Sequence, residues 1–224
     1  MRWSVHEPQR IGHALALVVV RVVLLFFFGM GLLGSLMVDG DVFGGGWRSV
    51  VLVLGMLFPL DAGLVLWLLL LKVGRCSLRE LGWRFDDVAR DVARGVVGFV
   101  LCAAVLVAAQ LMMGTSLDAQ REALLEPSLM ARLLFCCIAV FGAALVEESL
   151  FRGYLQPALA ARLGLPSAIV LQAVIFDLMH LNFHPASLVV KFVFGVVFGV
   201  LRGRDGSLLA PAVAHGLIWV VFGA

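Results

Sequence analysis

Long apolar stretches separated by short polar segments run through the chain. A helix needs about 20 apolar residues to cross a membrane, and about seven stretches approach that length. They lie at about residues 12–37, 49–71, 93–113, 131–153, 166–181, 186–201 and 207–222. The last three are short and contain polar residues, so we expect them to pack inside the bundle. The pattern predicts an all-α fold, a polytopic transmembrane helical bundle with about seven spanning helices in a single domain over residues 1–224.

The composition supports a membrane protein. Hydrophobic residues make up 62% of the chain and charged residues 14%, whereas a soluble domain is nearer half apolar and a quarter charged. The net charge is only +2 and gives no indication of nucleic-acid binding. The four cysteines form no CxxC pair, so we interpret them as core thiols without a disulfide or metal role. The first apolar stretch is too long for a signal peptide and is expected to be a retained helix.

Basic residues are distributed unevenly between the loops. If the N-terminus is cytoplasmic, the inner loops carry most of the arginines, and the outer loops carry only Arg48, Arg121 and Arg132. Cytoplasmic loops of membrane proteins are enriched in Lys and Arg, so we predict a cytoplasmic N-terminus. The compact chain looks bacterial, which indicates the bacterial inner membrane. The polar connection at 72–94 has apolar residues at helical spacing between charges, so it forms either a helix along the membrane surface or a solvated loop.

Several ionisable residues fall inside three of the predicted spans: Glu147, Glu148, Arg152, Asp177, His180 and His215. Such residues are costly in lipid and usually face the bundle interior. Two histidines and a carboxylate pair on separate helices therefore predict a shared polar site. Arg21 and Asp61 lie at similar depth in the first two spans and are interpreted as a structural ion pair, or Arg21 as a snorkelling side chain. Lys191 is also expected to snorkel.

The stretch EESLFRG, at 147–153, follows directly on an uncharged apolar run. Glu148 and Arg152 are spaced i, i+4, so they share a helix face and can pair. Glu147 is turned about 100° away from Glu148, which leaves it free to act. A carboxylate in a low-dielectric site is a useful general base. Histidines beside it can orient a water, donate a proton or stabilise an oxyanion, so these are the parts needed to hydrolyse an amide.

Three motifs together resemble those of the CPBP intramembrane proteases. They are EESLFRG at 147–153, FDLMH at 176–180 and HGLIW at 215–219. That family contains the type II CAAX prenyl endopeptidases and bacterial relatives linked to bacteriocin processing and self-immunity. Its pattern is EExxxR, FxxxH and HxxxN or a near variant, on successive membrane helices. The resemblance implies an intramembrane protease whose motif-bearing core spans about 131–222.

The same resemblance implies a role for each motif residue. Glu147 would activate water with the help of His180. Glu148 and Arg152 would support the site, and His215 would belong to the oxyanion hole. The family is viewed as a glutamate-type protease that needs no metal in the chemical step. No cofactor is therefore expected, although two glutamates and two histidines could bind zinc with one position open. Against zinc, the sequence has no HExxH motif.

One position departs from the family pattern. The asparagine expected four residues after the last histidine is Trp219. Its indole N–H can donate one hydrogen bond, Asn182 or His184 can supply a donor instead, or activity is reduced or lost. Asp177, one turn before His180, can orient that imidazole or pair with it.

The leading hypothesis is an intramembrane endopeptidase that cleaves a membrane-associated protein or peptide. Removal of a C-terminal anchor or sorting signal and peptide processing are both compatible with it. The alternatives are a metal-dependent version of the same protease, a small transporter or proton relay, and a non-catalytic binding or immunity protein. A transporter is expected to show repeated halves or broken helices around a midplane site, and the sequence has neither signal. The sequence leaves the oligomeric state open.

Overall fold

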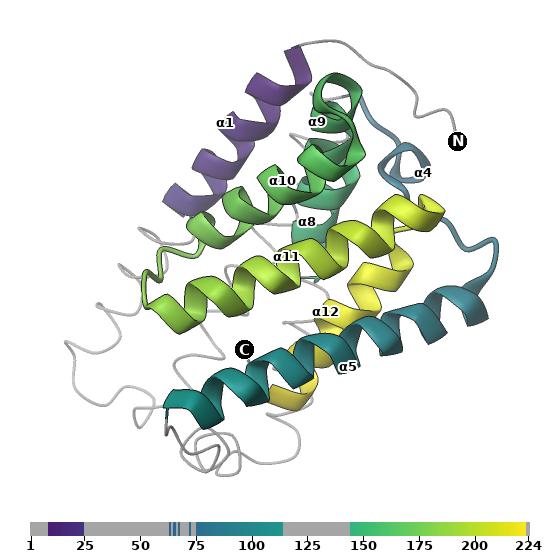
Figure 1. The fold of residues 1–224 in the computed structure, drawn as a ribbon. Coiled ribbons are helices and arrows are strands. Elements are labelled where there is room, and N and C mark those ends of the chain that lie inside the picture. The colour runs from purple at the N-terminus through teal and green to yellow at the C-terminus, as the bar shows by residue number, and fades with distance from the viewer. Residues whose placement is uncertain are drawn as a thin grey trace, which may run out of the picture.

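The computed structural model describes residues 9–24, 63, 65, 67, 72, 75–113 and 144–222. Every regular element in these residues is helical, which confirms the predicted all-α class for this part of the chain (Figure 1). The elements are α1 Gln9–Val23, α4 Leu78–Leu81, α5 Val88–Met113, α8 Leu145–Glu147, η4 Glu148–Leu155, α9 Gln156–Leu163, α10 Leu165–Met179, α11 Pro185–Asp205 and α12 Leu209–Phe222.

Two of the described helices, α5 and α11, are long and apolar enough to cross a membrane. Length and composition alone make this a weak indication of a membrane protein. Helices α1, α10 and α12 are apolar but shorter. The predicted sixth span is longer than the 186–201 expected, because its helix continues to Asp205. Seven spanning helices are not confirmed, since the predicted span at 49–71 and the start of the one at 131–153 lie largely outside the described residues.

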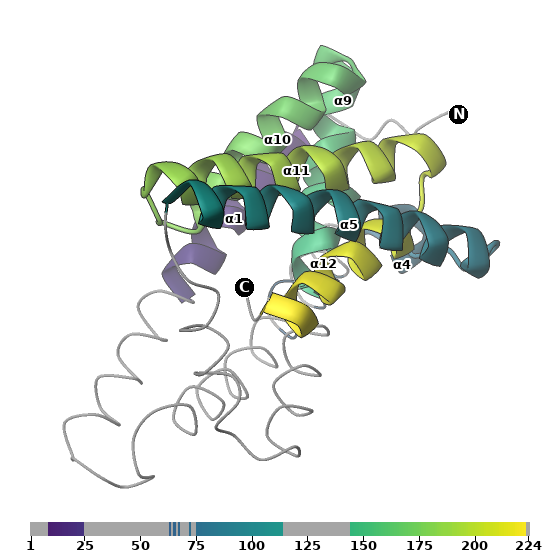
Figure 2. The ribbon, with the colours of Figure 1, turned by 60° about the horizontal axis from the view of Figure 1, so that its bottom comes forward.

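Helix α11 occupies the middle of the described bundle. It packs against α10 on one side and against α5 and α12 on the other, and α5 also runs along α12 (Figures 1 and 2). Helices α8, η4 and α9 form one continuous helical segment, and α1 packs against η4. The segment that carries EESLFRG is therefore contacted by α1, α4, α10 and α11, which come from distant parts of the chain.

Close approach between α10 and α11 depends on small residues and buried amides. The Gln172 amide donates to the carbonyl oxygen of Gly195 at 2.8 Å, and the Gln156 amide donates to that of Gly199 at 2.9 Å. A Cβ atom at Gly199 would lie only 2.8 Å from Gln172 Nε2. In a membrane the hydrophobic effect does not drive helices together, because the lipid tails are also apolar. Small residues at the interface let the two backbones come close enough to pack and to form hydrogen bonds. The two glutamine bonds then tie α11 to α10 and α9.

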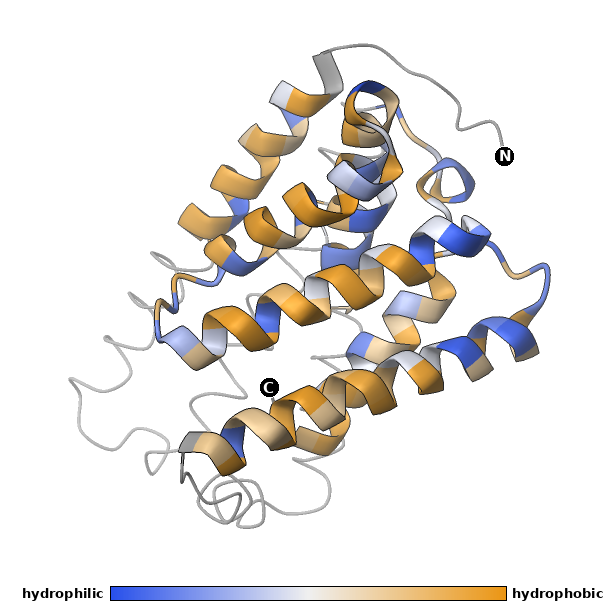
Figure 3. Cartoon of the chain, in the orientation of Figure 1, coloured by the Kyte–Doolittle hydropathy of each residue, from blue (hydrophilic) through white to orange (hydrophobic). Residues whose placement is uncertain are grey.

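Charged residues gather where α5 begins and where α11 ends. Figure 3 shows these two helix ends as hydrophilic and the bodies of both helices as mostly hydrophobic. An ion pair between Arg94 and Asp205 joins the two ends. Beyond them lies the segment 75–87, which contains the four-residue helix α4.

This segment is not a continuous surface helix, and most of its residues are exposed, as the loop alternative expects. Leu81 is buried in the core cluster that includes η4, and α5 takes over from Val88. Arg202 explains the packing, because it is itself buried. Its Nε donates to the Arg152 carbonyl oxygen at 3.1 Å, and its Nη2 donates to that of Leu81 at 3.0 Å. Arg202, which lies just beyond the predicted span at 186–201, thus links α11 to the motif helix and to the segment 75–87. Cys76 and Cys102 are buried, as expected of core thiols, and Cys136 and Cys137 lie outside the described residues.

Candidate active site

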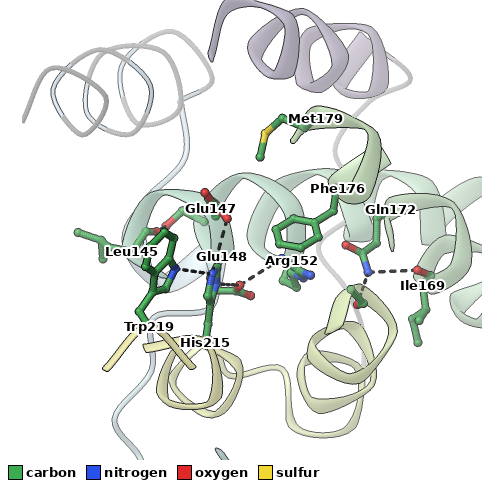
Figure 4. A network of polar contacts seen from close by, with 12 residues as sticks. Leu145, Glu147, Glu148, Arg152, Ile169, Gln172, Phe176, Met179, His215 and Trp219 are labelled. Atoms are coloured by element: carbon green, nitrogen blue, oxygen red, sulfur yellow. Dashed lines mark hydrogen bonds and ion pairs between the residues drawn. The ribbon is translucent and has the colours of Figure 1, made fainter. Parts of the chain in front are cut away.

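The first motif lies where the helix changes its winding. α8 ends at Glu147, and the next turns, Glu148–Leu155, are a π-helix in which Gln156 N–H donates to the Phe151 carbonyl oxygen five residues back. Such wider turns are rare and occur frequently at functional sites. Glu147, Glu148 and Arg152 are all buried here. Figure 4 shows them facing His215 and Trp219 of α12, with Phe176 of α10 beside Arg152.

Glu148 is held by two donors on one of its oxygens. Arg152 Nη1 lies 3.1 Å from Glu148 Oε1, and His215 Nδ1 lies 2.8 Å from the same oxygen. The predicted i, i+4 pair is therefore confirmed. Both of its partners have side chains that are 0% exposed. A buried ion pair is tolerated only where geometry and further hydrogen bonds compensate desolvation, and the histidine supplies one such bond.

Aromatic rings surround the guanidinium of Arg152. Its carbon atom Cζ lies 4.2 Å from the ring centroid of Phe176, 5.1 Å from that of Phe198 and 5.8 Å from that of Phe151. Within the described residues, Arg152 Nε and Nη2 have no hydrogen-bond acceptor. Ring faces attract a desolvated cation and partly replace those hydrogen bonds. The phenylalanine of FxxxH is thus part of the cage around the motif arginine.

Glu147 is paired with Arg21, for which the sequence predicted a different partner, Asp61. Arg21 Nη2, from α1, donates to Glu147 Oε1 at 2.9 Å, and Arg21 is only 1% exposed. Arg21 Nη1 also donates to the Met179 sulfur at 3.3 Å. Glu147 is therefore also paired with a cation, which the spacing of the motif did not predict. Because Arg152 neutralises only one of two adjacent buried carboxylates, the second needs its own cation. Asp61, the partner expected for Arg21, lies outside the described residues.

The second oxygen of Glu147 is differently placed. Glu147 Oε2 is buried and has no hydrogen-bond partner in the part of the chain that is described, although His215 Nε2 lies 3.7 Å away. Glu147 and His180 are close enough to interact electrostatically. One oxygen of the carboxylate is therefore fixed, and the other is available to a ligand.

His180 caps the end of α10 and is oriented by the backbone. Its Nδ1 lies 2.7 Å from the Phe176 carbonyl oxygen, and its ring meets the Phe176 ring edge to face at 4.8 Å. A carbonyl oxygen only accepts, so Nδ1 carries the proton and Nε2 keeps a lone pair. Of the two roles considered for Asp177, orienting this imidazole and pairing with it, neither has a hydrogen bond behind it among the described residues. Asp177 Oδ1 is buried without a hydrogen-bond partner in that part of the chain, and the His180 Nδ1 position is taken by the Phe176 carbonyl oxygen.

His215 bridges the two carboxylates, and Trp219 contacts it. Nδ1 donates to Glu148, and the Trp219 indole N–H donates to His215 Nε2 at 3.3 Å. The His215 ring also stacks on Phe198 with a centroid distance of 5.2 Å. With Nδ1 protonated and Nε2 accepting, the neutral ring has no remaining N–H to donate. The other candidate donors, Asn182 and His184, are exposed after α10, where Asn182 Oδ1 accepts from the His184 backbone N–H.

The segment 75–87 supports the motif from a third side. Trp83 Nε1 donates to Ser149 Oγ at 2.8 Å, and that hydroxyl donates to the Leu145 carbonyl oxygen at 2.6 Å. A Cβ atom at Gly153 would lie 2.9 Å from the Leu81 carbonyl oxygen, so glycine permits this contact. Sequence reasoning missed these supports and the role of Arg21. The sequence did hold one indication of such a cation. The EExxxR motif has two carboxylates and a single arginine, so one buried carboxylate needs a positive partner from outside the motif.

The described residues give the zinc alternative no support. No group of three or more His, Cys, Asp or Glu side chains in the described ranges could hold a metal ion. Glu148 Oε1 and His215 Nδ1 are engaged with each other, and Glu148 Oε1 is also engaged with Arg152. Two of the atoms that the zinc hypothesis would use are thus engaged in the polar network, whereas Glu147 Oε2 has no hydrogen-bond partner among the described residues.

Comparison with known proteins agrees with the motifs. Residues 129–221, less than half of the chain, match the family model described as Type II CAAX prenyl endopeptidase Rce1-like. The match confirms the resemblance to the CPBP proteases. It indicates CAAX-type intramembrane protease activity in general terms, and the family is membrane-embedded. No curated protein and no solved structure matches the chain.

Proposed function

Because residues 129–221 carry a Rce1-like type II CAAX prenyl endopeptidase domain, we propose that the protein is a glutamate-type intramembrane endopeptidase. Its substrate is a membrane-associated protein or peptide, and Glu147 is the general base. The observation that carries this proposal is the asymmetry of the Glu147 carboxylate. Arg21 holds Oε1, whereas Oε2 is buried without a hydrogen-bond partner among the described residues.

His180 supplies the second half of the water site. Its Nε2 and Glu147 Oε2 are both acceptors, so a water molecule between them donates both of its hydrogens. The water oxygen then presents a lone pair to the substrate. Two fixed acceptors orient the nucleophile, and the carboxylate takes its proton as attack proceeds.

The proposed reaction is a hydrolysis that needs no redox partner. The water oxygen bonds to the peptide carbonyl carbon while one water proton passes to Glu147 Oε2. The C–N bond of the tetrahedral intermediate then breaks, and the leaving nitrogen takes the proton from Glu147. The products are a carboxylic acid and an amine, and Glu147 returns to its starting state. Glu148 and Arg152 hold His215 and the helix in position throughout.

Hydrolysis also needs a donor to the oxyanion of the tetrahedral intermediate. The role that the resemblance implies for His215 needs an N–H on Nε2, and Trp219 donates to that atom. We propose that substrate entry displaces the indole from His215 Nε2. A proton taken from bulk water as the substrate binds, and returned when the product leaves, lets this nitrogen donate to the oxyanion while Nδ1 still donates to Glu148. A donor aimed at the developing oxyanion is worth about 10²–10³ in rate.

We further propose a bacterial inner membrane location with the N-terminus in the cytoplasm. Removal of a C-terminal anchor or sorting signal, and processing of a peptide precursor, are the candidate roles. Prenylated CAAX proteins are not expected as substrates in a bacterial membrane. The metal-dependent version of the protease predicts stoichiometric metal in the purified protein, and metal analysis tests it.

The test compares protein termini in membranes and medium from strains that carry the natural protein or Glu147→Gln. We expect a small set of termini to vanish in the variant, because loss of a general base lowers rates about 10²–10⁴-fold. Identical sets of termini at equal protein abundance would contradict the proposal.

Two further variants make the test sharper. Glu80→Gln is the matched control, since Glu80 lies in the exposed capping box that begins α4, and glutamine also satisfies such a box. It should leave every terminus in place. His180→Gln changes the water site without removing a charge from an ion pair, so it keeps the test valid if Glu147→Gln accumulates poorly. We expect it to lose the same termini.

A non-catalytic binding or immunity protein is the second candidate, and the Trp219–His215 bond favours it. In that function the polar site binds a peptide without cutting it. Termini that do not change in Glu147→Gln, together with retention of a bound peptide by the purified natural protein, would support it.

A further inference from the structure

Arg21 belongs to the site but comes from outside the family-matched region. It lies on α1, 126 residues before Glu147 in the chain, and the match begins at residue 129. None of the three motifs contains it. Its guanidinium is buried, and its Nη2 lies 2.9 Å from Glu147 Oε1.

The pair determines what Glu147 can do. An isolated carboxylate is too costly to keep ionised in a dry interior, so without a cation it holds a proton. A general base must be ionised before it can take a proton from water. Arg21 provides the compensating charge at Oε1 and leaves Oε2 to face the water site.

The other charged and titratable groups near Glu147 do not replace Arg21. On its own helix, Glu148 is an anion and Arg152 is paired with it at 3.1 Å. His215 of α12 lies 3.7 Å away, but its Nε2 accepts from Trp219. His180 of α10 and Lys191 of α11 interact with Glu147 electrostatically, without an ion pair to it among the described residues.

We propose that Arg21 is a positioning residue of the reaction, which holds Glu147 ionised and fixes its carboxylate with Oε2 toward the water. This inference rests on the proposed function. A merely structural role, in which Arg21 only fastens α1 to the motif helix, makes a different prediction. A hydrogen bond between His13 Nδ1 and the Tyr154 hydroxyl, at 2.9 Å, also joins α1 to η4. A variant of His13 therefore serves as the matched control for a variant of Arg21.

The experiment measures kcat and KM separately, on a peptide spanning a cleavage site that the terminus mapping identifies. Arg21→Gln removes the charge and keeps a donor, and kcat should fall about 100-fold with KM changed less than about 3-fold. Arg21→Lys keeps the charge and should recover kcat to within about 10-fold of the natural enzyme. His13→Phe loosens the same helix contact and should leave kcat within about 3-fold.

Retention of kcat in Arg21→Gln would overturn the inference, as would an equal loss in folded Arg21→Lys and Arg21→Gln. Thermal unfolding in detergent shows which variants are folded, and Arg21→Met replaces Arg21→Gln if the latter does not accumulate. The two proposals fail separately. If Glu147→Gln cleaves normally, the proposed function is wrong. If Glu147→Gln is inactive and Arg21→Gln is fully active, only the assignment of Arg21 is wrong.

Discussion

Glu147 and Glu148 are adjacent in the chain, yet different parts of the molecule hold them. Glu148 pairs with Arg152 on its own helix, and His215 donates to the same oxygen. Glu147 pairs with Arg21 on α1 and leaves one oxygen without a hydrogen-bond partner among the described residues. Two identical side chains therefore differ in what they can bind. Glu148 is held in a hydrogen-bond network, whereas Glu147 has one oxygen available to a ligand. Chemical role here depends on the neighbouring helix and not on the residue type.

Ser149 extends the comparison by one residue. Its hydroxyl accepts from Trp83, so three successive residues contact three separate regions: α1, α12 and the segment 75–87. Each residue in a helix turns by roughly 100° from the last, and this segment is packed on several sides. The motif is short because one helical turn can reach all of these partners.

The largest effect on stability is expected at Glu148. Glu148→Gln leaves Arg152 as an uncompensated charge in a fully buried position, and breaking a buried pair in this way costs about 3–5 kcal/mol. Glu147→Gln should cost less, because Arg152 and His215 both bond to Glu148 whereas Arg21 alone forms a hydrogen bond with Glu147 among the described residues, while its loss of activity should be greater. Thermal unfolding of the detergent-solubilised variants measures the difference.

The double variant Glu148→Gln with Arg152→Met tests the reason for that loss. Removing both charges should recover part of the stability, since replacing a buried pair by apolar groups is often close to neutral. Equal unfolding temperatures for Glu147→Gln and Glu148→Gln would show that the two carboxylates are held alike, and the comparison would then fail.

A smaller effect, on rate, is expected at Trp219. Trp219→Asn removes the indole donor from His215 Nε2 and offers a compact amide near the site. If His215 serves the oxyanion, kcat should rise by about 10-fold, which corresponds to about 1.4 kcal/mol in the barrier. The measurement is cleavage of the mapped peptide, with Trp219→Phe to separate loss of the N–H from loss of ring volume. A fall in kcat for both variants would mean that the indole itself assists the reaction.

The smallest effect is expected at Ser149. Ser149→Ala leaves the Trp83 N–H without its acceptor, and an unsatisfied, partly buried donor costs about 1–2 kcal/mol. Cleavage should change little, because neither carboxylate touches this hydroxyl in the described structure. The double variant Ser149→Ala with Trp83→Phe also removes the indole N–H that has lost its acceptor, and it should restore most of the lost stability. A large loss of activity in Ser149→Ala with normal unfolding would instead connect this third contact to the chemistry.

The parts of the site that were predictable depend on local spacing. The Glu148–Arg152 pair follows from an i, i+4 interval, and the structure contains it. The apolar pattern predicted helices close to where α5, α10 and α12 are found. The loop alternative describes the 72–94 connection only in part, because Leu81 packs against the motif helix and Arg202 donates to the Leu81 carbonyl oxygen. Such burial depends on partners far away in the sequence.

The sequence by itself determined that the chain forms apolar helices, that buried charge collects in three motifs, and that two of those charges can neutralise each other. These properties follow from periodicity and composition, which act over a few residues. Only the tertiary structure decided that Arg21 holds Glu147, that the Phe176 carbonyl oxygen orients His180, and that Trp219 donates to His215. A side chain in a low-dielectric interior takes the partner that helix packing brings within hydrogen-bond distance, and no local pattern encodes that choice.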